Sequence, residues 1–116
     1  MSLHDRVVIT GLGAVSALGL GANALFDGSL AGRSGIRLWP PEAGIWAAAP
    51  VPGDLGPVGM HQLPAHVDRH VGLATLAVRE AMADAGLENV PAAESASTGV
   101  YWGTGVGSAA TVEDSY

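Results

Sequence analysis

The chain has 116 residues, and 48% of them are hydrophobic but only 5% aromatic, so few large side chains are available for a core. This length allows one domain at most. The net charge is −6, from 5 Lys+Arg against 11 Asp+Glu, and the positive residues are arginines scattered along the chain. No basic surface for nucleic acid is therefore predicted. Cysteine is absent, which excludes disulfides, thiolate metal sites and a cysteine nucleophile supplied by this chain.

Residues 7–26 carry no formal charge and have the length of a membrane span. Glycines and polar residues interrupt the segment too often for a membrane helix, so none is predicted. A signal peptide is the alternative, because Ala22-Asn23-Ala24 has the small-x-small form of a cleavage site. The residues before the segment lack the net positive charge of such a leader, and we expect a cytoplasmic protein that does not contact membranes.

The first elements are a strand and a helix. Residues 6–10 are a continuous β-branched run, typical of a strand that is buried on both faces. Residues 14–20 contain too many glycines for an assignment. A helix is predicted over residues 23–30, with Asn23 as its N-cap and Gly32 as the residue that ends it.

Residues 39–64 are rich in proline and glycine and predict a long irregular excursion. The most strongly patterned segment follows it. Over residues 65–85 apolar side chains recur at steps of three and four, which predicts a largely buried helix. Gly86 is the expected left-handed residue after its end, and Leu87 can fold back onto the last turn.

The last part of the chain is predicted as a polar loop over residues 89–97, a second buried strand over 98–102 and a glycine turn over 103–107. A further helix begins at Ser108. Two strands separated by helices predict a parallel pair with crossover connections. Such a sheet needs more strands and cover on both faces, so the fold class is α/β and incomplete.

The sequence Gly11-Leu12-Gly13 after the first strand is in the place of a dinucleotide-binding fingerprint. Gly19 and Gly21 interrupt the helix that should follow, and no acidic residue lies where a ribose hydroxyl would need one. A small dinucleotide-binding module therefore remains only a weak alternative.

Two histidines invite a metal interpretation. His66 and His70 are four residues apart and would share a helical face, as in some zinc sites. The only third ligand nearby is His61 in the irregular excursion, so we interpret the pair as surface histidines and predict no metal site. The chain also has no G-x-S-x-G nucleophile motif and no P-loop.

Five short strings, in order, closely resemble the opening of β-ketoacyl-acyl-carrier-protein synthases. The resemblance covers roughly residues 5–38 and 65–116, which leaves out the proline-rich stretch between them. The matching strings are RVVITGLGAVS at residues 6–16, LAGRSGI at 30–36, Asp68-Arg69, AMADAGL at 81–87 and GVYWGTGVG at 99–107.

The resemblance implies the N-terminal portion of a thiolase-like fold and a decarboxylative Claisen condensation of acyl and malonyl thioesters, in fatty-acid or polyketide synthesis. It also implies acyl carrier protein as partner, a homodimer for the complete enzyme, and no cofactor. The family uses a cysteine nucleophile and two histidines. These residues lie beyond the position that corresponds to Tyr116, so no catalytic residue is assigned in this chain.

One site position carries over from the resemblance. Val106 matches the family position that lines and gates the acyl-chain pocket. Five glycines of the first and last matching strings are interpreted as structural turn residues. These are Gly11, Gly13, Gly103, Gly105 and Gly107.

The residues themselves leave a further function open, that of a non-catalytic chain that pairs with a condensing enzyme through its second strand. In either role we expect the isolated chain to be inactive and poorly stable. Exposed strand edges and half-covered helices bury too little surface to offset backbone entropy of ~1–2 kcal/mol per residue.

Overall fold

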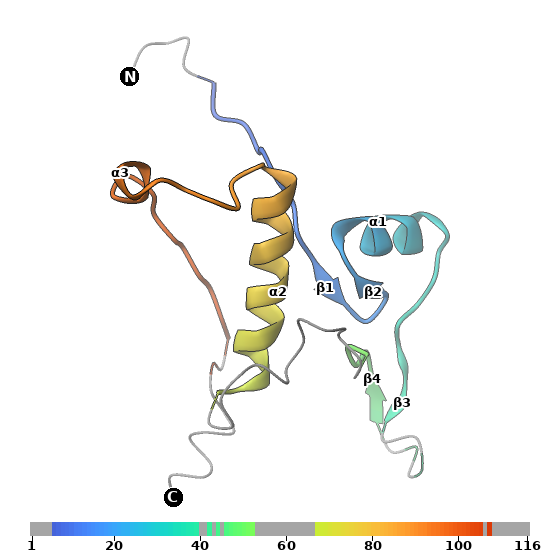
Figure 1. Cartoon of the computed structure of the whole chain (residues 1–116). Helices are drawn as coiled ribbons and strands as arrows, with labels where there is room; N and C mark the ends of the chain where they lie inside the picture. The colour runs from blue at the N-terminus through green and yellow to red at the C-terminus, as the bar shows by residue number, and fades with distance from the viewer. Residues whose placement is uncertain are drawn as a thin grey trace, which may run out of the picture.

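The computed structural model of the chain describes residues 6–39, 42, 44, 46–52, 67–105 and 107. Figure 1 shows the small strands β1 and β2 and the helix α1 on one side of the long helix α2. In order, the elements are β1 (Val15–Ser16), β2 (Gly19–Leu20), α1 (Ala22–Leu30), β3 (Arg37–Trp39), β4 (Trp46–Ala48), α2 (Arg69–Asp84) and α3 (Ala92–Ser95). The content is therefore α/β, as expected.

Helix α1 ends at the predicted glycine but begins differently from the prediction. The N-cap is Gly21, so Asn23 lies inside the helix and makes no capping hydrogen bond. At the other end Gly32 has a φ of +65°. Its N–H donates to the Ser29 carbonyl oxygen at 3.1 Å, and the N–H of Arg33 donates to the Gly28 carbonyl oxygen at 2.9 Å. This pair of bonds is a Schellman motif, which a left-handed glycine permits.

Helix α2 confirms the strongest pattern in the sequence. Gly86 follows it with a φ of +70°, and the N–H of Leu87 donates to the Met82 carbonyl oxygen at 2.8 Å, as in α1. The prediction that this helix is largely buried is wrong for the described residues. Only Gly72 is buried in it, and Val71 and Val78 are exposed by 38% and 45%.

The described strands form two antiparallel hairpins, so the parallel pair predicted from the sequence is not formed in this part of the chain. In the first hairpin Val15 pairs with Leu20, and in the second Trp39 pairs with Trp46. Residues 6–10 and 98–102 are extended but are not strands. Their side chains are open to solvent, with exposures from 57% at Trp102 to 97% at Tyr101. A parallel strand needs a neighbour to accept and donate its backbone hydrogen bonds, and no described segment offers one.

The second hairpin extends into the proline-rich excursion. Strand β4 lies inside the predicted irregular range, and the guanidinium of Arg37 on β3 lies 5.4 Å from the centre of the Trp39 ring. The Arg69 side chain at the start of α2 donates to the Val51 carbonyl oxygen at 3.2 Å, which ties the end of this region to the helix. The short helix α3 lies in the predicted loop over 89–97. The helix predicted from Ser108 lies outside the described residues.

No large side chain of the described residues is fully buried. The first hairpin and α1 are joined to α2 by close backbone approach and by side-chain hydrogen bonds to backbone amides. No described helix is long and apolar enough to cross a membrane.

Candidate functional site

Residues 11–14, which we call the glycine turn from here on, lie directly against the backbone of α2. A Cβ atom built on Gly11 would collide with the Ala81 carbonyl oxygen and lie 2.7 Å from the Ala85 nitrogen. One built on Gly13 would collide with the Ala77 carbonyl oxygen. Neither glycine has a positive φ. The sequence predicts them as turn residues, but in the structure glycine is needed at both positions because two backbones approach closely.

Two carboxylates of α2 accept hydrogen bonds from this turn. The N–H of Leu12 donates to Asp84 Oδ2 at 2.9 Å. The N–H of Ala14 donates to Glu80 Oε2 at 2.9 Å. The other oxygen of that carboxylate, Oε1, accepts from the N–H of Ala22 at 2.8 Å. Glu80 therefore bridges the glycine turn and the first residue of α1.

This arrangement bears on the dinucleotide interpretation. A phosphate at such a fingerprint would use the backbone amides of the turn and of the helix N-terminus. Here Ala14 and Ala22 already donate to Glu80. The amides that a diphosphate would need are occupied by a side chain of the same molecule.

No role was assigned to Glu80 or Asp84 from the sequence. A signal was present: the two carboxylates lie four residues apart and so share one face of α2. That face meets the backbone amides of Leu12 and Ala14, which donate to the two carboxylates.

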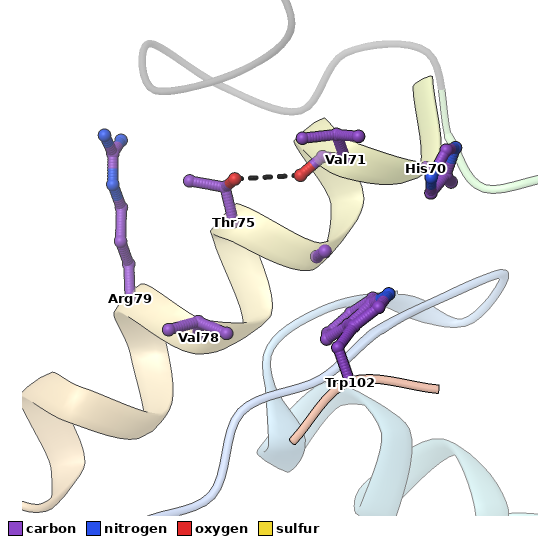
Figure 2. Close-up of a pocket in the computed structure, with 7 residues that line it drawn as sticks. His70, Val71, Thr75, Val78, Arg79 and Trp102 are labelled. Carbon is purple, nitrogen blue, oxygen red and sulfur yellow. Dashed lines mark hydrogen bonds between the residues drawn. The ribbon is translucent and has the colours of Figure 1, made fainter. Parts of the chain in front are cut away.

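A groove runs between α2 and the Trp102 side chain. Figure 2 shows the indole ring beneath the helix, with Arg79 extending away from it. The cavity has a volume of about 380 Å³. Its lining is mostly apolar and consists of His70, Val71, Ala74, Thr75, Val78, Arg79 and Trp102.

The groove has the chemistry of a binding or packing surface. The hydroxyl of Thr75 donates to the Val71 carbonyl oxygen at 2.8 Å, so it is engaged within the helix (Figure 2). The remaining polar groups are the His70 ring and the exposed Arg79 guanidinium. No lining residue is a cysteine or a carboxylate that could serve as nucleophile or base. An apolar chain or a further protein segment fits such walls.

A second groove lies on the other side of the glycine turn, along α1. Its volume is about 410 Å³, and Leu25 and Phe26 of α1 form its apolar wall with Leu12 of the turn. Phe26 is 62% exposed. Like the first groove, it is open and apolar, so it is also a surface for packing rather than for chemistry.

The predicted acyl-pocket residue, Val106, lies outside the described residues. The chain that leads to it is described up to Gly105. Gly103 and Gly105 have open space where a Cβ would lie. Gly107 has a φ of +65°, and its N–H donates to the Thr104 hydroxyl oxygen at 3.2 Å.

The histidine pair is described only in part. His70 is half-buried at the start of α2 and lines the groove with Trp102, whereas His61 and His66 lie outside the described residues. In the part of the chain that the structure describes, no three His, Asp or Glu side chains come together in a way that could hold a metal ion.

Comparison with known proteins extends the resemblance over nearly the whole chain. Residues 4–116 match the family model described as "Beta-ketoacyl synthase, N-terminal domain". The match is continuous, so it includes the proline-rich excursion that the short strings left out. No match was found among curated proteins, and none among solved structures.

Proposed function

The chain belongs to the β-ketoacyl synthase family, and we propose that it supplies the N-terminal part of a 3-oxoacyl-acyl-carrier-protein synthase. The complete enzyme would join an acyl group to a malonyl thioester with loss of carbon dioxide, in fatty-acid or polyketide synthesis. The observation that carries the proposal is the family match over residues 4–116. The thiolase-like architecture belongs to the same proposal.

We propose that this chain is inactive alone and acts within a complete condensing enzyme. The family's chemistry requires a cysteine thiolate as nucleophile, and the chain contains no cysteine. The lining of the groove between α2 and Trp102 supports this, because none of its side chains could replace a thiolate. The chain's contribution is therefore scaffold and pocket wall.

Within that enzyme, Val106 would line the acyl-chain pocket. The support is its match to the family position and the apolar groove at Trp102, four residues earlier in the chain. A Cβ atom built on Gly103 or on Gly105 would meet open space. An apolar wall at this point suits an acyl chain, since burial of each CH₂ contributes ~0.8 kcal/mol. Acyl carrier protein would deliver both thioesters, and the complete enzyme would act as a homodimer in the cytoplasm without a cofactor.

The test is a condensation assay with acyl- and malonyl-carrier-protein thioesters. The purified 116-residue chain is expected to form no 3-ketoacyl product, and a complete β-ketoacyl synthase in the same assay serves as positive control. Product from the chain alone would overturn the proposal that the nucleophile lies outside it. In the complete enzyme, Val106→Phe is expected to shorten the longest acyl chain accepted, while Val106→Ile changes it little.

The second candidate is a non-catalytic partner chain of a condensing enzyme. The exposure of Val100 and Tyr101, at 86% and 97%, favours it, because these side chains lie on an extended segment without a strand neighbour. Native mass spectrometry of the chain mixed with a complete family member distinguishes the two roles. A stoichiometric complex that leaves the enzyme's own N-terminal part in place would support the partner role, and a separate monomer would count against it.

A further inference from the structure

We infer that Glu80 is a positioning residue whose carboxylate acts as an internal anion and fixes the segment of residues 11–30 on α2. The inference goes beyond the proposed function, because it concerns how this part of the scaffold is assembled. It rests on the two hydrogen bonds that the carboxylate accepts from separate elements, at 2.9 Å and 2.8 Å.

The first of these elements is the N-terminus of α1. Ala22 is its first residue, so the amide of Ala22 has no acceptor within the helix. The N-cap, Gly21, has no side chain to offer, and α1 has no acidic residue in its first turn. Glu80 supplies from α2 the negative charge that the N-terminal end of a helix dipole favours.

The second element is the start of the β1–β2 hairpin. The N–H of Ala14 donates to Glu80, and the carbonyl oxygen of Ala14 accepts from the N–H of Gly21 at 2.8 Å. Both ends of the hairpin thus converge on one carboxylate. A Cβ on Gly21 would lie 3.1 Å from Glu80 Oε1, so glycine at this position leaves the carboxylate its room.

Hydrophobic packing around this segment is incomplete. No large side chain of the described residues is fully buried, and Phe26 and Leu30 of α1 are exposed by 62% and 73%. The contact between the turn and α2 at Gly11 and Gly13 is backbone against backbone. It sets how close the two segments lie, whereas the hydrogen bonds to Glu80 and Asp84 set their register along the helix.

The bidentate geometry makes the inference specific. In Glu80→Gln the side chain keeps one carbonyl oxygen and replaces the other by an NH₂ group, which cannot accept a hydrogen bond. One of the two amides must then lose its acceptor. Glu80→Ala removes both acceptors, and a small carboxylate from solution could enter the space that is left. Glu88→Gln removes a charge from an exposed residue just past the end of α2 and is the matched control.

The experiment is site-resolved amide hydrogen exchange on the full 116-residue chain and its variants. The isolated wild-type chain is expected to be poorly stable as a whole, but its Ala14 and Ala22 amides should exchange more slowly than amides that make no hydrogen bond. Glu80→Ala should lower protection at both by roughly tenfold or more, since hydrogen bonds to charged groups have at least that effect. Glu80→Gln should lower it at one of the two only, and Glu88→Gln at neither.

Acetate provides a readout that a loss of packing would not give. Sodium acetate should restore protection of both amides in Glu80→Ala, and sodium chloride at the same ionic strength should not. If Glu80→Ala unfolds α2 as well, the single loss in Glu80→Gln decides the question. The inference is overturned if both amides stay protected in Glu80→Gln, if Glu88→Gln has the same effect, or if the two amides exchange freely in the wild-type chain.

Discussion

Two parts of the chain differ in how they contact the rest of the molecule. Residues 11–32 are fixed: glycines let the turn approach the helix, and Glu80 and Asp84 accept hydrogen bonds from its amides. Residues 6–10 and 98–102, which carry several large apolar side chains, remain open to solvent. The apolar segments are the exposed ones, and the glycine-rich one is docked.

The difference lies in where each segment finds its hydrogen-bond partners. The docked turn uses acceptors on the neighbouring helix, which the same chain carries. An extended segment in a parallel sheet needs strands on its sides and helices on its faces. In a β-ketoacyl synthase domain we interpret the two exposed segments as strands that are completed by other parts of the enzyme. Hydrophobicity alone therefore does not determine which segments pack against the rest of this chain.

The largest effect is expected from a methyl group at the turn. Gly13→Ala would place a Cβ against the Ala77 carbonyl oxygen and 2.8 Å from the Ala81 nitrogen, both in rigid helix backbone. We expect the free energy that holds the turn on α2 to fall by about 3 kcal/mol, at the upper end of typical overpacking costs. Amide exchange at Leu12 and Ala14 measures it. Gly103→Ala, with nothing within 4 Å, is the control, and an equal loss there would contradict the explanation.

A smaller effect is expected at the end of α2. Gly86 has a φ of +70°, a conformation that costs an L-residue about 1–2 kcal/mol. Gly86→Ala should therefore lower the protection of the Leu87 amide by that free energy, and Gly86→Asn by less, since asparagine tolerates this region better. Equal protection in all three proteins would show that the left-handed glycine does not stabilise the helix end.

Polar substitution of the exposed segment should leave the docked one unchanged. Val100→Ser removes an apolar side chain that is 86% exposed, so we expect less than about 0.5 kcal/mol change in the protection of Ala14 and Ala22. The same variant should bind less of a hydrophobic dye than the wild-type chain. A large loss of protection in the turn would mean that the two regions are coupled, contrary to the comparison.

No effect is expected from nicotinamide dinucleotides. The amides of Ala14 and Ala22 donate to Glu80, so the fingerprint has no free donors there for a diphosphate. NADPH fluorescence should not change when the chain is added. An enhancement that saturates with protein concentration would restore the dinucleotide interpretation.

Local signals in the sequence predicted the presence of the two longer helices, α1 and α2, but missed α3. Gly32 and Gly86 were identified as the residues that end the helices, because glycine readily adopts the left-handed conformation that follows a helix. The two hairpins were missed, because their strands are only two and three residues long and leave no periodic pattern in the sequence. The parallel pair was predicted from the strand-like character of residues 6–10 and 98–102, which says nothing about whether a neighbour is present. The contacts of Glu80 with Ala22 and Ala14 were not predicted, because these residues lie 58 and 66 positions away in the sequence.

The most direct test of this account is amide exchange at Val8, Ile9 and Val100. It should be measured in the isolated chain and again after mixing with a β-ketoacyl synthase from which the matching N-terminal part has been removed. We predict rapid exchange at all three in the isolated chain and protection in the mixture, as strands acquire neighbours. Protection already present in the isolated chain, or exchange that stays rapid in the mixture, would contradict the account.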